Sequence, residues 1–116
     1  MARIAWQELE DTTAELLGGK KIVRDWSSFE SAPDVEVPDF NLVCDCKAYQ
    51  RFSHHTLLET CKRKYCGRAE VPALVTRRPS GRPVISLPLD YFAGLLSEIR
   101  AARSARNGGG NGDAHV

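Results

Sequence analysis

Two short strands joined by a turn are predicted in PDVEVPDFNLVCDCK, residues 33–47. Residues 35–37 are expected to form the first strand and residues 42–48 the second. Pro38 and Asn41 mark the turn between them, because proline lacks the N–H that a central strand must donate. The stretch therefore predicts a β-hairpin whose second strand carries an Asp-Cys-Lys triplet.

Side chains alternate between the two faces of a strand, so Asp45 and Lys47 should share one face of this hairpin. Cys44 and Cys46 should point to the other face, where we expect them to be buried as small hydrophobic side chains. A lone Asp-x-Lys is also typical of a surface salt bridge on an edge strand. Whether the triplet belongs to a functional site therefore depends on the residues that the rest of the chain places beside it.

Helices and strands are predicted on both sides of the hairpin. Gly18-Gly19 should end a first helix, and Ser53 is a suitable N-cap for a second one. We expect helix 3–17, strands 21–26, 35–37 and 42–48, helix 56–65, strands 71–76 and 84–87, and a helix from 90 to about 102. This order, α-β-β-β-α-β-β-α, predicts an α/β domain over residues 1–104 with a mixed sheet of about five strands. Residues 105–116 are glycine-rich and are expected to be a disordered tail.

The charges are distributed unevenly, although the net charge of the 116 residues is only +1. Residues 1–46 contain four Lys/Arg and ten Asp/Glu, whereas residues 47–83 contain nine Lys/Arg and two Asp/Glu. An acidic cluster followed by a basic segment suits a metal site next to a surface that binds a polyanion. A mixed, solvated surface would give the same pattern.

Asp34 and Asp39 compete as the second carboxylate beside Asp45. In an antiparallel hairpin that turns near residues 38–41, Asp34 lies opposite Asp45, and directly opposed Cβ atoms are about 5 Å apart. Asp39 lies in the turn and is better explained as a turn former. Two adjacent carboxylates with open coordination positions favour Mg²⁺ or Mn²⁺, and a neighbouring lysine can assist an attacking water.

The Pro-Asp hairpin, the Asp-x-Lys triplet and the flanking helices resemble the PD-(D/E)xK nuclease superfamily. Within it, the chain is similar to the archaeal-type Holliday junction resolvases and their phage relatives, over roughly residues 6–96. The resemblance implies a restriction-endonuclease-like fold and Mg²⁺- or Mn²⁺-dependent hydrolysis of DNA. The family usually has glutamate where this chain has Asp45, and aspartate shortens the reach to the metal.

The resemblance also implies a glutamate on the first helix that joins the metal site. Glu10 borders the apolar stripe of that helix, whereas the spacing to Gly19 would match the family's glutamate to Glu8. Because facing is the stronger physical argument, we choose Glu10. The resemblance implies a catalytic set in which Lys47 assists water and the metal ligands are Asp34, Asp45, Glu10 and the backbone carbonyl of Cys46.

Basic and polar side chains that flank this set are candidate DNA contacts. The N-terminus of the second helix is suited to binding phosphate, and such contacts position a duplex without reading its sequence. Each of these residues could equally be a solvated surface group. The candidates are Arg24, Ser27, Arg51, His54, His55, Lys62 and Arg63, with further basic residues up to position 82.

The four cysteines raise the alternative of a structural zinc site in a binding module. Cys44 and Cys46 are separated by a single residue, whereas zinc knuckles use two to four. Thiols or metal ligands are nevertheless expected rather than disulfides, because residues 1–13 contain no apolar signal core. A cytoplasmic location, in a prokaryotic or phage-infected cell, is therefore expected.

The function that these patterns favour is a structure-selective endonuclease that resolves four-way DNA junctions during recombination or repair. Symmetric cutting of a junction requires two sites, so the resemblance implies a homodimer. Two alternatives remain open. The chain could be another nuclease of this superfamily that acts on flaps, nicks or mismatches, or a non-catalytic nucleic-acid-binding domain.

Overall fold

The predicted hairpin lies in the middle of a five-stranded sheet. The computed structural model describes residues 5–23, 32–48 and 53–111. The elements are α1 (Ala5–Leu17), β1 (Lys20–Lys21), β2 (Val35–Val37), the short 3₁₀ helix η1 (Pro38–Phe40), β3 (Leu42–Lys47), α2 (His54–Tyr65), β4 (Val71–Thr76), β5 (Val84–Ser86) and α3 (Leu89–Asn111).

The sheet is mixed and has the strand order β1-β2-β3-β4-β5. β3 and β4 are parallel because α2 connects them as a crossover, and the other neighbouring pairs are antiparallel. This confirms an α/β fold with about five strands in a mixed sheet. The first strand is shorter than expected, since it ends at Lys21, and residues 24–26 of the expected strand lie outside the described residues.

The register of the central hairpin is the one that the sequence predicts. Val35 lies opposite Cys44 and Val37 opposite Leu42. The turn is made by η1 and by Asn41, whose backbone is left-handed with φ 56° and whose N–H donates to the Pro38 carbonyl. Asparagine tolerates this conformation better than most residues do, which is why the turn can reverse the chain here.

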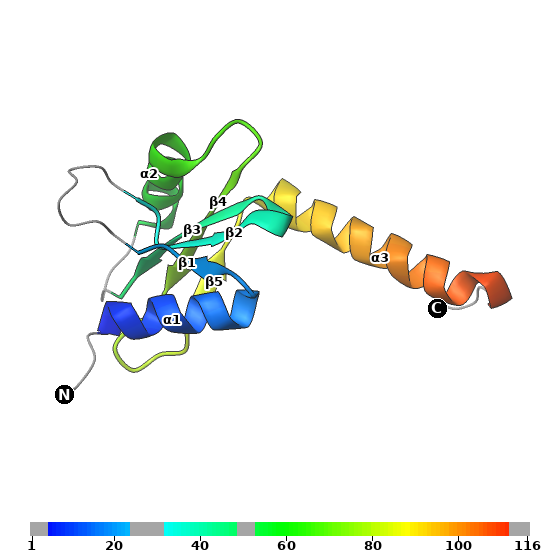
Figure 1. Cartoon of the computed structure of the whole chain (residues 1–116), viewed down its shortest axis with the longest axis horizontal. Helices are drawn as coiled ribbons and strands as arrows, with labels where there is room; N and C mark the ends of the chain where they lie inside the picture. Colours follow the sequence, from blue (N-terminus) through cyan, green and yellow to red (C-terminus); the bar gives the residue numbers. More distant parts are fainter. Residues whose placement is uncertain (1–4, 24–31, 49–52, 112–116) are drawn as a thin grey trace.

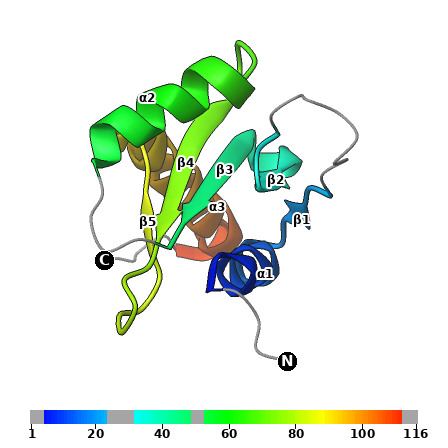
Figure 2. The ribbon, with the colours of Figure 1, turned by 90° about the vertical axis from the view of Figure 1, so that its left-hand side faces the viewer.

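Helices α1 and α2 cover opposite faces of the sheet (Figure 2). The core beneath α1 contains Leu9 together with inward-facing residues of β2, β3 and β4, including Cys44 and Cys46. On the other face, the Cys61 thiol of α2 lies 3.6 Å from the Val43 carbonyl of β3. The alternation of β3 therefore buries its two cysteines on the α1 side and directs Asp45 and Lys47 to the α2 side.

Two glycines end α1 in a Schellman motif, as the sequence indicates. Gly18 has φ +65°, and the N–H of Gly19 donates to the Ala14 carbonyl at 2.8 Å. A Cβ atom at Gly19 would lie only 2.8 Å from the Glu36 carbonyl oxygen. This glycine thus allows the chain to leave α1 directly onto the edge of β2.

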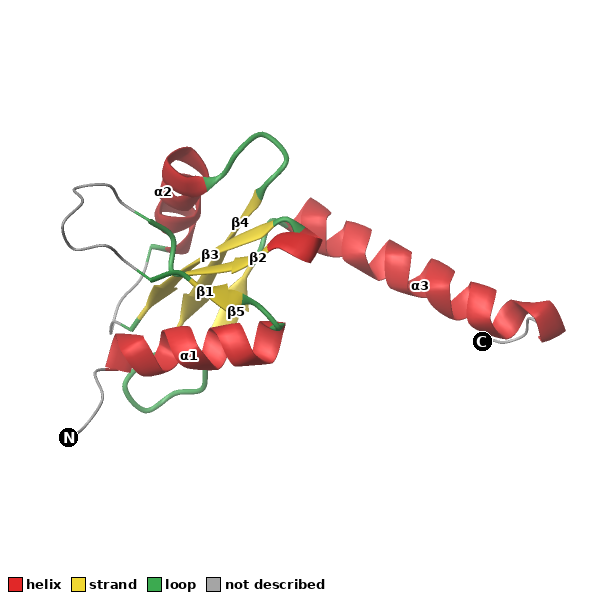
Figure 3. Ribbon diagram, in the orientation of Figure 1, coloured by secondary structure: helices red, strands yellow, loops and turns green. Residues whose placement is uncertain are grey.

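Helix α3 projects away from the sheet and its two covering helices (Figures 1 and 3). It continues to Asn111, so the expected helix end near Ala102 is too early. Alanine and arginine, both strong helix formers, fill most of the segment from 100 to 106 and carry the helix into the glycine-rich region. Residues 105–111 are therefore helical, and residues 112–116 lie outside the described residues.

None of the described helices combines the length and apolar composition that a membrane span requires.

Candidate active site

A buried pair of aspartates lies where β2 begins beside β3. Because Val35 is opposite Cys44, the preceding Asp34 comes opposite Asp45, as the sequence predicts. The Asp34 N–H donates to the Cys44 carbonyl at 3.1 Å, and Asp34 Oδ2 accepts from the Cys46 N–H at 2.8 Å. The two aspartates are only 3% and 8% exposed. The backbone of β3 therefore fixes the Asp34 carboxylate against the strand that carries Asp45.

Asp34 and Asp45 lie close enough together for Asp34 to affect the protonation of Asp45. Burial is the main cause that raises the pKa of Asp45 to about 6, and the hydrogen bond and negative charge of Asp34 raise it further. Lys47 opposes this shift. A carboxylate pair of this kind is stabilised either by a proton at low pH or by a cation at neutral pH.

Lys47 lies beside this pair, on the same face of β3 as Asp45. Its Nζ is 3.4 Å from Asp45 Oδ2, and its side chain remains partly exposed at 27%. The predicted sharing of one face is thus confirmed. The ammonium group can reach both the carboxylate and a group that arrives from solvent, which a lysine buried in a closed ion pair could not do.

Glu10 faces inward from α1, and Glu8 does not. Glu10 is 5% exposed, and its negative charge contributes to the raised pKa of the Cys46 thiol. Its Oε1 lies 3.8 Å from Lys21 Nζ. The Glu8 side chain is 41% exposed and lies 3.9 Å from Arg77. The Glu10 side chain therefore faces inward, which is the reason for choosing it over Glu8. Its role as a metal ligand stays a prediction.

Of the three predicted carboxylate ligands, the structure brings together Asp34 and Asp45 and does not gather Glu10 with them into one group. Among the described residues no group of three or more His, Cys, Asp or Glu side chains is arranged to hold a metal ion. Mg²⁺ is commonly held by one or two carboxylates and keeps its other positions for water and substrate phosphates. Asp34 and Asp45 can supply those two carboxylates, and the backbone carbonyl of Cys46 is adjacent in the chain.

The cysteines have the environment of buried thiols. All four are free, and burial is the main cause that raises the pKa of Cys44, Cys46 and Cys61 to about 12. The Cys46 thiol contacts the Thr13 hydroxyl of α1 at 3.6 Å, on the opposite side of the sheet from Cys61. A zinc site needs thiolates that converge on one point, so this arrangement favours the hydrophobic role that the strand pattern predicts.

The predicted DNA contacts fall into three groups. His54 and His55 are exposed at the start of α2, and Arg63 is exposed further along it. Lys62 instead donates to the Glu70 carbonyl at 2.7 Å and ties the end of α2 to the segment before β4. The others, Arg24, Ser27 and Arg51, lie outside the described residues.

Lys21 is a site residue that the sequence pattern did not indicate. It ion-pairs with Asp11 at 2.9 Å and lies near Glu10, because β1 runs directly back along α1 after the Gly18-Gly19 turn. Antiparallel pairing of β1 with β2 places Lys21 opposite Val35, one residue from Asp34. In the sequence, the short connection between α1 and β1 was the one feature that could have indicated that Lys21 lies close to α1.

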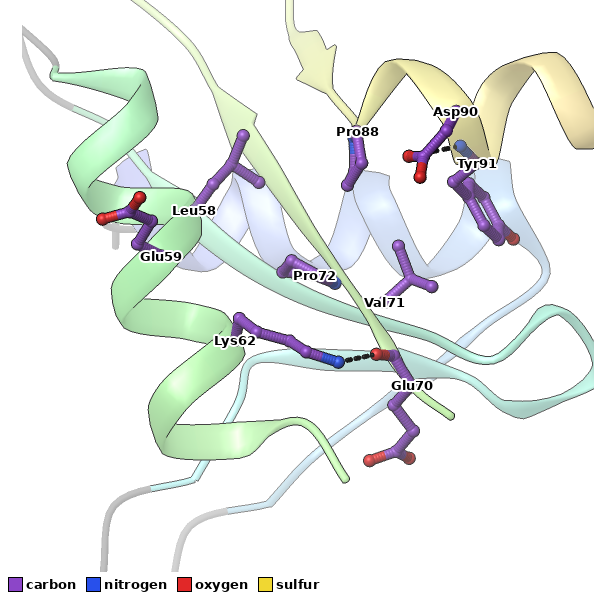
Figure 4. A pocket seen from close by; sticks show the side chains of 9 residues that line it. All are labelled: Leu58, Glu59, Lys62, Glu70, Val71, Pro72, Pro88, Asp90 and Tyr91. Carbon is purple, nitrogen blue, oxygen red and sulfur yellow. Dashed lines mark hydrogen bonds between the residues drawn. The ribbon is translucent and has the colours of Figure 1, made fainter. Parts of the chain in front are cut away.

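A pocket of about 520 Å³ lies at the other end of the sheet from the aspartate pair (Figure 4). It is formed by α2, the start of β4 and the start of α3, and its floor includes Leu58, Val71 and Pro72. Neither the aspartate pair nor Lys47 lines it. The charged residues Glu59, Lys62, Glu70 and Asp90 also line this pocket, but the side chains of Lys62, Glu70 and Asp90 are hydrogen-bonded to nearby backbone groups. We base the site on the aspartates, because they form a buried pair beside Lys47.

Comparison with known proteins assigns no family to this chain. No protein-family model matches the sequence, and no curated protein matches it significantly. The functional conclusion therefore rests on the residues and their geometry.

Proposed function

We propose that this protein is a divalent-metal-dependent DNA endonuclease with a restriction-endonuclease-like fold that cuts four-way junctions. The observation that carries the proposal is the buried Asp34–Asp45 pair with Lys47 Nζ 3.4 Å from Asp45. The resemblance implies the order helix, strand, hairpin, helix and two strands, and the α/β structure with its five-stranded mixed sheet supports the proposal at that level. Because β3 and β4 are parallel, their C-terminal ends lie side by side, at the end of the strands where Lys47 lies.

The reaction assigned to this site is hydrolysis of one phosphodiester bond. A water oxygen forms a bond to phosphorus and gives up one proton to solvent, the bond from phosphorus to one sugar oxygen breaks, and that oxygen leaves with a proton from solvent. A bound Mg²⁺ supplies positive charge to the phosphate oxygens and makes water a better nucleophile. Asp34 and Asp45 would hold the cation, and Lys47 would orient the water and offset the negative charge that develops. Glu10 lies on α1, which covers the other face of the sheet, so it would support the cation through water.

The two ionised aspartates would repel each other in a buried site, and this is why the pair suits a cation. Burial is the main cause of the raised pKa of Asp45 in the protein without metal, and the charge of Asp34 adds to it. A plain surface salt bridge between Asp45 and Lys47 would instead lower the pKa of the aspartate. The direction of the shift is that of a buried carboxylate beside a second one, which a bound cation would stabilise, and differs from that of an exposed salt bridge.

We also propose that the active form is a homodimer, since a junction has two strands to cut. Phe92 and Ile99 are each 45% exposed on α3, and Leu95 and Leu96 lie on the same helical face. Antiparallel pairing of two such helices about a twofold axis would put Phe92 of one copy against Ile99 of the other. This pairing would cover apolar surface that the body of the protein leaves exposed on α3.

Selectivity among DNA structures separates this proposal from its alternatives. The test incubates the wild-type protein with labelled four-way junction, flap and linear duplex, with and without Mg²⁺. Preferential, Mg²⁺-dependent cutting of the junction is expected. Equal cutting of all three substrates would favour another nuclease of the superfamily, and binding of DNA without cutting would favour a non-catalytic domain.

A further inference from the structure

A second, positively charged pocket lies near the catalytic lysine. It has a volume of about 190 Å³ and is formed by the start of α2, the end of β4 and the turn that leads to β5. Figure 2 shows that this turn extends beyond the end of the sheet. The residues that line the pocket are His54, Thr76, Arg78, Gly81, Arg82 and Val84.

The lining of this pocket has the composition of an oxyanion site. It includes two guanidinium groups and an imidazole, and no carboxylate is among the residues that line it. The turn brings the two arginines together, because the Gly81 N–H donates to the Arg78 carbonyl at 3.0 Å and Arg82 follows directly. Guanidinium groups bind phosphate oxygens through paired N–H donors, so both arginines can contact one phosphate.

The register of the sheet connects this pocket to the aspartate site. Thr76, which lines the pocket, lies opposite Lys47 in the parallel β3–β4 pair. The N–H of Arg77 also donates to the Lys47 carbonyl at 3.2 Å. The backbone that carries Lys47 is therefore hydrogen-bonded to the segment that begins the cationic turn. A nucleic-acid strand held beside Lys47 would pass the mouth of this pocket.

We propose that the pocket binds a backbone phosphate of the DNA strand, next to the phosphate that is hydrolysed. This inference rests on the proposed nuclease function for the identity of the strand. Arg78 and Arg82 supply the charge that holds the phosphate, and His54 lies beside them from α2. Such a contact sets the position of the strand over Lys47 without selecting its sequence.

The test measures DNA affinity in protein that cannot cut. Asp45→Asn is the background, and Arg78→Gln and Arg82→Gln are added singly and together. Arg100→Gln is the matched control, because Arg100 is exposed on α3, which projects away from the sheet, and loses the same charge. Fluorescence anisotropy of a labelled four-way junction is followed from 50 to 300 mM NaCl, a range over which phosphate contacts weaken steeply.

We expect the double variant to bind on the order of tenfold more weakly than the background, with the slope of log K against log salt reduced by about one. Arg100→Gln should change both quantities much less. Inorganic phosphate should compete with DNA in the background protein more strongly than in the double variant. Equal affinities and slopes in the double variant and the Arg100 control would overturn the proposal.

The subsite and the proposed nuclease function can fail separately. If the wild-type protein cuts no DNA but the arginine variants still lose affinity and salt slope, the phosphate pocket stands and the catalytic proposal falls. If the wild type cuts and the arginine variants bind like the control, the pocket is wrong and the aspartate site stands. Both arginines are exposed, so equal melting temperatures should show that the variants are folded.

Discussion

Asp45 has a buried side chain whose ionisation lowers stability, and it is also part of the proposed metal site. In the folded protein its pKa is raised to about 6 from an ordinary value of 3.8, mainly because the side chain is buried beside Asp34. The folded state therefore holds a proton on this group over a range of pH in which the unfolded chain has lost it. In the proposed site, a bound cation would offset the cost of ionising this aspartate.

The stability of the protein should reflect this cost. Between about pH 4 and pH 6 the folded state binds more protons than the unfolded state, so the Asp45 contribution to the free energy of unfolding falls as the pH rises. Asp45→Asn should be more stable than the wild type at pH 7.5 by about 1–3 kcal/mol, and the difference should shrink toward pH 4. Urea unfolding at several pH values measures it.

The effect of Mg²⁺ on the melting temperature provides the control for the predicted stability of Asp45→Asn. If the pair binds the cation, millimolar Mg²⁺ should raise the melting temperature of the wild type at pH 7.5 and leave that of Asp45→Asn nearly unchanged. An equal stability of both proteins at all pH values, with no effect of Mg²⁺ on either, would contradict the account of the pair.

Glu10 and Glu8 form a matched pair two positions apart on α1. Glu10→Gln should lower the rate of junction cleavage by roughly 10- to 100-fold, as expected when a group that supports a metal is lost. Glu8→Gln should leave the rate within about twofold of the wild type, because Glu8 is half exposed and near Arg77. Single-turnover cleavage rates at saturating Mg²⁺ distinguish the two. The reverse order would assign the helix acid to Glu8.

At the scale of elements, the turn chemistry of the chain determines where its helices and strands stop. Gly18 takes a left-handed conformation after α1, and Asn41 takes one before β3. Both positions could be predicted, since few other residues adopt this backbone easily. With the turn fixed near Asn41, the hairpin register follows, and the register alone places Asp34 opposite Asp45.

The close approach of Gly19 to β2 gives a stability test. Gly19→Ala places a Cβ atom 2.8 Å from the Glu36 carbonyl oxygen and 3.0 Å from the Val35 and Val37 side chains. We expect a loss of about 1–3 kcal/mol in the free energy of unfolding, the usual cost of overpacking.

Gly94→Ala is the control for that substitution. Gly94 lies within α3 with open space around its Cα, so the added methyl group should stabilise the protein by about 0.5–1 kcal/mol. Thermal or urea unfolding of both variants provides the comparison. A neutral Gly19→Ala would mean that α1 does not approach β2 as closely as described.

Two elements differ in length from the expectation, one for a tertiary reason and one for a local reason. β1 ends at Lys21 although the sequence favours a longer strand, because only its first residues pair with β2. Helix α3 runs past Ala102 because its alanine- and arginine-rich segment favours helix and the glycines that follow do not stop it at once. The inward facing of Glu10 was predictable from the helical wheel. The contact of Lys62 with the Glu70 carbonyl was not, because it depends on the path of a loop.

At the scale of the whole molecule, α3 is an element whose apolar side chains the rest of the described domain leaves exposed. Figure 1 shows it extending from the sheet, and its Phe92 and Ile99 side chains remain exposed. A helix with an apolar face is rarely stable alone in water, since most helical stability in proteins comes from packing. A second copy would provide that packing.

The homodimer has a direct test. Ile99→Glu should convert a dimer to a monomer, because it places a charge in the middle of the apolar face. Ser97→Glu adds the same charge on the opposite side of α3 and should leave the dimer intact. Light scattering coupled to size exclusion gives the mass. A wild-type monomer at tens of micromolar would contradict the dimer and leave the active-site proposal standing.

The central claim concerns metal-dependent hydrolysis at the aspartate pair beside Lys47. The measurement that tests it most directly is the single-turnover rate at which a labelled four-way junction is cut, with Mg²⁺ and with EDTA, by the wild type, Asp45→Asn and Lys47→Ala. We predict cutting by the wild type in Mg²⁺ alone, and a loss of at least about 100-fold in each variant while junction binding is kept. Cutting by the wild type in EDTA, or undiminished cutting by Asp45→Asn, would contradict the account.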